Sequence, residues 1–186
     1  MSKLNIQKIL SEHAKWLRGV GGNRAYLSGA DLSHLDLQNA CLSHANLLSA
    51  NLNSVNLNSA SLSHTNLRFA DLRFADLRVA DLSYADLRFA DMRFADLRGA
   101  DLGYADLRSA VLPKTDAILA SPFGWCHVQR DYIRIGCQYR KTSSWRRLSD
   151  KLIDKMDDGA LIWWKQHKGV VMAMAEACEL HKEAGE

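Results

Sequence analysis

The amino-acid sequence contains a five-residue repeat that runs without insertion or deletion through residues 25–114. Leucine occupies the centre of each unit from Leu27 to Leu112, every fifth residue, with Met92 as the one replacement. Alanine usually stands two residues before the centre, and Asp or Asn often stands directly before it. A period of five matches neither the 3.6-residue period of an α-helix nor the two-residue period of a strand. A fixed short period is instead typical of stacked coils in a solenoid.

A second period of twenty residues lies above the first, because residues 65–84 match residues 85–104 almost position for position. Four units per coil predict a square coil with leucine and alanine pointing inward and the other three positions pointing outward. Stacking such coils builds four walls, each named here by its centres. Wall 1 contains Leu27, Leu47, Leu67, Leu87 and Leu107; wall 2 contains Leu32, Leu52, Leu72, Met92 and Leu112; wall 3 contains Leu37, Leu57, Leu77 and Leu97; wall 4 contains Leu42, Leu62, Leu82 and Leu102.

The unit Ala70, Asp71, Leu72, Arg73, Phe74 resembles the motif A-[D/N]-L-x-x of the pentapeptide-repeat family. The resemblance implies a mainly β fold, a right-handed quadrilateral parallel β-helix, here of about four and a half coils of twenty residues. Residues 9–32 are similar to the helix-plus-glycine lead-in of many such proteins. Residues 135–167 resemble a C-terminal module of phage and prophage accessory proteins, which leaves a phage or a bacterial origin open.

Two further segments flank the solenoid of residues 25–114. Residues 1–24 predict an N-terminal capping helix followed by a glycine linker, because apolar residues recur at helical spacing and three glycines follow. Residues 115–186 predict a small C-terminal α+β module, with a β-hairpin over 123–141 and helices over 145–156 and 160–182.

The second predicted helix of the module is rich in large apolar residues. Trp163, Trp164 and Met172 are therefore candidate contacts of a homodimer. The alternative is that the module packs on the solenoid, and the sequence leaves this choice open.

Length and composition indicate a soluble cytoplasmic protein. The 186 residues carry a formal net charge of +3, too small to indicate a polyanionic partner. No apolar run is long enough to cross a membrane, and the N-terminus lacks a signal-peptide pattern. The four cysteines lack metal-finger spacing and are expected to be reduced thiols.

Three walls carry arginine directly after the centre: Arg68, Arg88 and Arg108 on wall 1, Arg73 and Arg93 on wall 2, Arg78 and Arg98 on wall 3. We expect each arginine to pair with an aspartate two residues earlier, as Arg88 with Asp86. This pattern predicts a solvated lattice of salt bridges. The alternative, a basic stripe for phosphates, is disfavoured because the aspartate columns cancel much of the field.

Aromatic residues occupy two corners of the predicted rod. Phe69 with Phe89, and Phe74 with Phe94, should project outward as stacked pairs. Exposed aromatic columns mark contact surfaces. They favour a partner or dimer contact, unless arginine stems or the C-terminal module cover them.

Wall 4 differs because it has no arginine. Its outward residues are small, namely Ser43, Ser63, Ser83 and Gly103, and the adjacent corner carries His44, His64, Tyr84 and Tyr104. Small residues beside an aromatic column allow close approach of another surface, which predicts a docking face. His44 and His64 with Cys41 lack a closed tetrahedral set, so we expect no metal site.

No catalytic constellation or phosphate-binding glycine loop appears, so we expect neither an enzyme nor a bound cofactor. The leading hypothesis is a rigid rod that binds and modulates a protein target, for example a phage-encoded inhibitor of a host or defence protein. The family implies an alternative, a DNA mimic that modulates a type II topoisomerase (gyrase). The net charge of only −2 in residues 25–114 counts against it. Nucleic-acid or nucleotide binding through the Arg and Phe ladders is a further alternative. The candidate partner contacts are Phe69, Phe74, Phe89, Phe94, Arg68, Arg73, Arg88, Arg93, His44, His64, Tyr84 and Tyr104.

Overall fold

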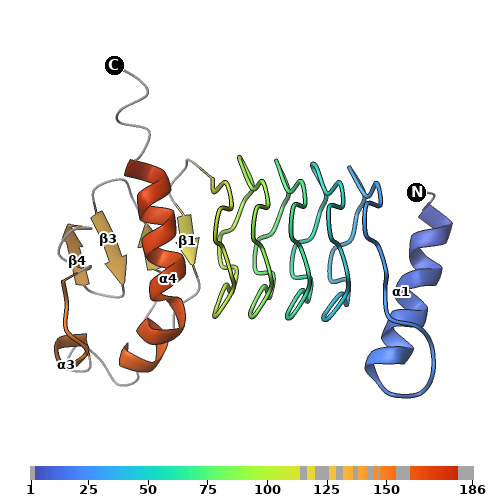
Figure 1. Ribbon diagram of the computed structural model, residues 1–186, viewed down its shortest axis with the longest axis horizontal. Helices are drawn as coiled ribbons and strands as arrows, with labels where there is room; N and C mark the ends of the chain where they lie inside the picture. The colour runs from blue at the N-terminus through green and yellow to red at the C-terminus, as the bar shows by residue number, and fades with distance from the viewer. Residues whose placement is uncertain are drawn as a thin grey trace.

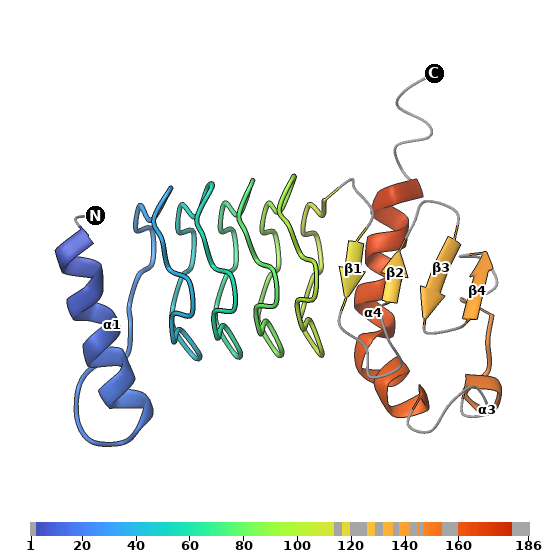
Figure 2. The same cartoon turned by 180° about the vertical axis from the view of Figure 1, so that it is seen from behind.

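A computed structural model describes residues 3–113, 117–119, 126–128, 132–135, 138–141, 145, 147–153 and 160–179. The solenoid forms a rod, with the helix α1 (Lys3–Leu17) across one end and the C-terminal module at the other (Figures 1 and 2). Among the described residues, no helix has the length and apolar character needed to cross a bilayer.

Each wall of the rod is a ladder of short parallel bridges twenty residues apart. The bridges run from Tyr26, which pairs with Asn46, to Val111, which pairs with Asp91. Within a wall the Leu27 amide donates to the Asn46 carbonyl at 2.7 Å, and the Asn46 amide donates back to the Ala25 carbonyl at 2.9 Å. The four-sided β-helix expected from the twenty-residue period is therefore present, although each strand is only a bridge long.

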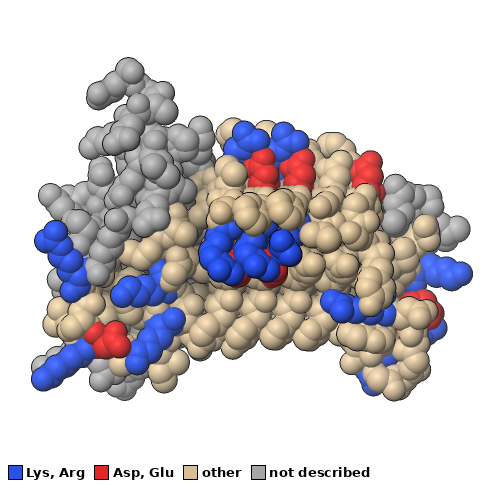
Figure 3. All heavy atoms as spheres, in the orientation of Figure 1, with Lys and Arg blue, Asp and Glu red and all other residues tan. Residues whose placement is uncertain are grey.

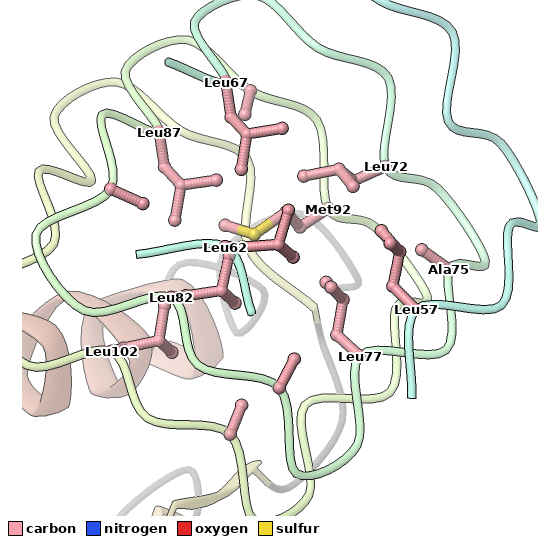
Figure 4. Close-up of a cluster of buried hydrophobic side chains, with 14 of the residues drawn as sticks. Leu57, Leu62, Leu67, Leu72, Ala75, Leu77, Leu82, Leu87, Met92 and Leu102 are labelled. Carbon is pink, nitrogen blue, oxygen red and sulfur yellow. The ribbon is translucent and has the colours of Figure 1, made fainter. Parts of the chain in front are cut away.

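The core of the rod consists of the leucine centres and the alanines two residues before them. Every centre from Leu27 to Leu102 is at most 3% exposed, Met92 included. Figure 4 shows part of this core, with labelled centres between Leu57 and Leu102 pointing inward from successive coils. Burying one leucine side chain stabilises the folded state by roughly 1.5–3 kcal/mol, so these centres supply most of the apolar stabilisation of the rod.

Thr65 takes one of the alanine positions and is also fully buried. Its hydroxyl donates a 2.8 Å hydrogen bond to the Leu42 carbonyl, which satisfies the polar group inside the core.

The corners form at the residue two places after each centre, which adopts a left-handed backbone conformation. The φ angles of these non-glycine corner residues lie between 55° and 63°, including Phe69, Phe74 and the β-branched Val79. This conformation is unfavourable for most residues other than glycine, Asn and Asp. The regular repeat of hydrogen bonds and core contacts holds every corner in it.

At the N-terminal end, α1 supplies the hydrogen bonds that a preceding coil would have made. The Ala25 amide donates to Nδ1 of His13 at 3.1 Å, so Nε2 carries the proton and donates to the Ser43 carbonyl at 3.0 Å. His13 is fully buried, and burial lowers its pKa because the protein interior disfavours the charged ring. Gly22 follows with a positive φ, and a Cβ there would lie 2.1 Å from the Glu12 carbonyl oxygen.

The described residues of the C-terminal module form four strands and two helices. The strands β1 (Ala117–Leu119), β2 (Cys126–Val128), β3 (Tyr132–Ile135) and β4 (Gln138–Lys141) form one antiparallel sheet in the order β1-β2-β3-β4. The helices are α3 (Asp150–Ile153) and α4 (Ala160–Glu179).

The prediction of a hairpin over 123–141 was therefore too simple. Three strands fall within that segment, and β1 adds a fourth before it. Such short strands in a non-repeating segment leave too weak a periodic pattern to be counted from sequence. Parts of the predicted 145–156 helix and the last residues of the predicted 160–182 helix lie outside the described residues.

Candidate protein-interaction surfaces

The arginine ladders form the salt-bridge lattice expected from their spacing, with one exception. Six arginines each hold the aspartate two residues earlier through both Nε and Nη2, at 2.5–2.9 Å in the shorter contacts: Arg73, Arg78, Arg88, Arg93, Arg98 and Arg108. These hydrogen bonds lower the pKa of Asp71, Asp76, Asp86, Asp91, Asp96 and Asp106. Figure 3 shows basic and acidic side chains lying together on the part of the rod nearer the C-terminal module.

The lattice also links successive coils. Nε of Arg88 lies 3.4 Å from a carboxylate oxygen of Asp106, and Nε of Arg73 lies 3.9 Å from one of Asp91. Each exposed pair contributes little alone, but interleaved signs prevent repulsion within a column. The guanidinium groups of the lattice are thus already neutralised by carboxylates of the same wall.

Arg68 is the exception and corrects the expectation that every arginine has its own aspartate. Residue 66 is Asn, and its side-chain oxygen accepts only the Arg68 backbone amide, at 3.2 Å. The Nε atom of Arg68 is buried without a hydrogen-bond partner among the described residues. Its guanidinium lies 5.5 Å from the centroid of the Phe69 ring. The departure is visible in the sequence as the missing carboxylate at position 66.

The phenylalanines lie at two adjacent corners, one on each side of wall 2. Phe69 and Phe89 stack with ring centroids 4.8 Å apart, and Phe74 and Phe94 stack at 4.9 Å. All four are about half exposed. The described part of the C-terminal module therefore leaves these columns open to solvent, and their role in binding stays a prediction.

Wall 4 carries one continuous ring stack at its corner. His44, His64, Tyr84 and Tyr104 follow one another with centroid separations of 4.7–4.8 Å. Beside them the Ser43 hydroxyl lies 2.8 Å from that of Ser61 and 3.0 Å from that of Ser63. Within the described residues, no group of three or more His, Cys, Asp or Glu side chains is arranged to hold a metal ion.

The C-terminal end of wall 4 is covered by α4. Nε2 of His167 lies 3.2 Å from an Asp101 carboxylate oxygen, and the Tyr104 amide donates to the Gln166 carbonyl at 3.3 Å. Gly103 makes this approach possible, because a Cβ there would lie 3.3 Å from Nε2 of His167. One end of the wall is thus used by the chain itself, and neither His13 nor His167 was predicted to make these contacts.

The candidate dimer contacts on α4 are mostly buried within the protein. Trp163 is 6% exposed and Trp164 is 1% exposed, and both belong to one apolar cluster with the solenoid core. The Trp164 ring lies 5.4 Å from that of Trp145, and the Trp163 ring stacks on His167 at 4.6 Å. Trp163 and Trp164 are therefore inaccessible to a second chain, which corrects their proposed role, while Met172 is partly buried against the same cluster.

A cavity of about 430 Å³ lies between the last coil and α4. Leu107, Leu112 and Val170 line it, together with the Asp106–Arg108 pair at the same coil. Gly169 also lines it, and a Cβ added there would meet nothing within 4 Å. The cavity remains because α4 does not fill all the space above the flat last coil.

The chain matches a known protein family. The family model of pentapeptide repeats matches residues 23–47, 45–83, 60–93 and 75–112. No curated protein sequence matches the chain significantly.

Several solved structures are similar to the solenoid. A pentapeptide repeat protein of the Arabidopsis thaliana thylakoid lumen is 32% identical over 47% of this chain and 61% of its own, with a TM-score of 0.46. HetL, involved in heterocyst differentiation regulation in the cyanobacterium Nostoc, is 40% identical over 47% of this chain and 45% of its own, with a TM-score of 0.39. QnrB1, a plasmid-mediated fluoroquinolone resistance protein, is 19% identical over 53% of this chain and 64% of its own, with a TM-score of 0.30. The chain spans less than two thirds of the length of each of these proteins.

Proposed function

The chain is a pentapeptide-repeat protein over residues 23–112, and from that premise we propose that it is a non-enzymatic module that binds and modulates a protein target. The family fold is a right-handed β-helix. A solenoid of this kind presents a long, preformed surface, so a partner would bind it without the entropy loss of ordering loops.

One observation carries the proposal: two columns of stacked phenylalanines stand half exposed on a rigid wall. Exposed apolar rings in contiguous columns are uncommon on soluble proteins and mark interaction sites. Rigid aromatic residues also dominate the energetics of protein interfaces.

The chemistry of the walls supports binding rather than catalysis. Six aspartates with lowered pKa values, Asp71 and Asp86 among them, are each held by an arginine of the same strand on an open wall. Catalytic carboxylates instead tend to have their pKa values adjusted by burial in a cleft. The described walls therefore favour a scaffold.

The proposal includes a cytoplasmic location and a target among host or defence proteins. The resemblance of residues 135–167 to a module of phage accessory proteins supports this choice of target. A homodimer through the phenylalanine columns is the competing use of the same surface, and light scattering at high protein concentration distinguishes the two.

Charge weighs against the two alternatives. A mimic of DNA that modulates gyrase would need a continuous acidic surface, whereas residues 25–114 carry a net charge of −2 and three walls carry arginine. Binding of nucleic acid would need free guanidinium groups, whereas six of the seven solenoid arginines are bound by aspartate. Capture of gyrase in competition with DNA would favour the DNA mimic. A steep salt dependence of binding would favour nucleic-acid binding.

The proposal is tested by affinity capture from bacterial lysate followed by mass spectrometry. We expect the Phe74→Ser/Phe94→Ser variant to lose a protein that the unmodified chain retains, with the affinity then measured on the purified pair. Ser54→Asn, at the same corner column in the N-terminal half, is the matched control and should retain it. Equal capture by all three proteins would exclude these columns as the binding surface.

A further inference from the structure

Building on the proposed function, we infer that Arg68 and the neighbouring phenylalanines form an acceptor site for a carboxylate side chain of the protein partner. The partner segment is expected to present Asp or Glu next to an apolar residue. The site lies on wall 1 and at the corner between walls 1 and 2.

The first support is that Arg68 has no carboxylate on its own strand. The other six solenoid arginines each form a two-point contact with a carboxylate two residues earlier, whereas Asn66 takes that place before Arg68 and accepts its backbone amide. Within the described part of the chain, no carboxylate lies within ion-pair distance of Arg68. The carboxylate of Asp86, in the next coil, is already held by Arg88 at 2.6 Å.

The second support is the distribution of charge among the walls. Wall 1 carries three arginines and two aspartates, which leaves one positive charge in excess. On wall 2 the three aspartates are balanced by two arginines and Lys114, on wall 3 the aspartates outnumber the arginines by one, and wall 4 carries aspartate without arginine. Wall 1 is thus the wall that attracts an acidic side chain.

The third support is the apolar setting of the guanidinium. Arg68 is half-buried and lies over the Phe69 ring, and Phe69 stacks on the half-exposed Phe89. An ion pair gains strength where the surroundings exclude water, and arginine beside aromatic rings is typical of interface hot spots. An apolar side chain next to the partner's carboxylate would cover the two rings.

A polyanion fits this site less well than a single carboxylate. One unpaired guanidinium offers one anchoring point, while nucleic acid presents a row of phosphates that needs several. A planar guanidinium also matches the two oxygens of a carboxylate.

The test titrates the full-length protein with the capped peptide Ac-Phe-Glu-Leu-Glu-Phe-NH2 and follows the arginine Nε–Hε signals by ¹⁵N NMR. We expect the Arg68 signal to move with this peptide but not with its glutamine counterpart, Ac-Phe-Gln-Leu-Gln-Phe-NH2. Signals of the six paired arginines should stay in place. Movement with both peptides, or of all arginine signals alike, would overturn the inference.

Two charge-matched variants complete the test. Asn66→Asp supplies the missing carboxylate and recreates the pair seen at Asp71 and Arg73, so we expect at least a tenfold loss of peptide affinity with an unchanged or higher melting temperature. Asn56→Asp adds the same charge to wall 3, where no unpaired arginine lies, and should change the affinity less than twofold. Equal effects of the two variants would contradict a site at Arg68.

The outcomes separate this inference from the proposed function. If Asn66→Asp still captures the protein that Phe74→Ser/Phe94→Ser loses, the protein-binding function stands and the carboxylate site does not. If the glutamate peptide binds at Arg68 but no protein is captured through the phenylalanine columns, the site stands and the proposed function does not.

Discussion

The two ends of the rod are closed by helices that use histidine in opposite ways. At the N-terminal end, His13 of α1 accepts a hydrogen bond from the Ala25 amide and donates one to the Ser43 carbonyl, so it serves as a neutral ring. At the other end, both neighbours of His167 are acceptors, the Trp163 carbonyl and the Asp101 carboxylate.

The difference teaches how a solenoid can end. A terminal coil exposes backbone groups that the next coil would have satisfied, and such groups are costly to leave unpaired once buried. The N-terminal end replaces the missing coil with a side chain, and the C-terminal end replaces it in part with the Gln166 carbonyl of α4. One closure depends on a neutral ring and the other on a charged contact, so they should respond differently to mutation and to acid.

The largest effect is expected for His13→Ala. The substitution removes both hydrogen bonds of a fully buried ring and leaves the Ala25 amide and the Ser43 carbonyl without these partners. We expect a loss of about 2–5 kcal/mol in the free energy of unfolding, measured with urea. The exposed His34, changed to Asn, is the control and should alter the stability by less than about 0.5 kcal/mol. Similar effects of both substitutions would show that α1 does not close the rod through His13.

A second, smaller effect is expected at the other end for Gly103→Ala. The new Cβ would lie 3.1 Å from an Asp101 oxygen and 3.3 Å from Nε2 of His167, which should push α4 away from wall 4. We expect a destabilisation of about 1–3 kcal/mol and faster hydrogen exchange in α4 but not in α1.

Gly169→Ala is the matched control for this substitution. Its Cβ meets nothing within 4 Å, and alanine favours a helix interior over glycine, so we expect a gain of about 0.5–1 kcal/mol. Destabilisation by both substitutions would mean that α4 tolerates no added methyl group, whatever its surroundings.

Acid should open the N-terminal end before the C-terminal end. The pKa of His13 is lowered by burial, so the stability that its neutral form provides is complete above the ordinary value of 6.5 and is lost as the pH falls below it. The pKa of Asp101 is lowered by its hydrogen bond with His167, so that contact persists until the pH falls below the ordinary value of 3.8. Residue-resolved hydrogen exchange between pH 7 and 3 should show protection lost first around α1. Simultaneous loss at both ends would contradict the two titrations.

The smallest effect is expected for Asp101→Asn. The substitution keeps a hydrogen-bond acceptor for His167 but removes the charge, and the Asp101 side chain is about half exposed. We expect a loss of about 0.5–1 kcal/mol, detected as a lower melting temperature. Asp81→Asn, one coil earlier on the same wall, is the control and should change the melting temperature less. An equal decrease would show that the contact between α4 and Asp101 adds nothing to the docking of the helix.

The sequence predicts the rod well because its information repeats. The five-residue and twenty-residue periods were enough to place the leucine centres, the four walls and the stacked phenylalanine corners. Arg68 shows the limit of averaging over repeats, because the single Asn66 changes the chemistry of one coil while leaving the pattern intact. A reading of each unit by itself would have found it.

The ends of the rod could not be predicted in the same way. His13 and His167 act on groups that are distant in sequence, so local periodicity contains no trace of their partners. The apolar residues of α4 are equally consistent with a buried face and with a dimer contact. In the structure α4 packs on the last coil, and Trp163 and Trp164 are buried there. The short strands of the module likewise depend on tertiary pairing.

Both closing helices contact wall 4, α1 at the Ser43 carbonyl and α4 at Asp101 and Gly103. This shared wall restricts how the gene for such a rod can lengthen or shorten. Adding or deleting one pentapeptide would turn the final wall by a quarter of the coil and present α4 with the wrong neighbours. Duplication of a whole twenty-residue coil preserves both junctions and extends the molecule by about 4.8 Å. The rods of related proteins are therefore expected to differ in length by whole coils of twenty residues.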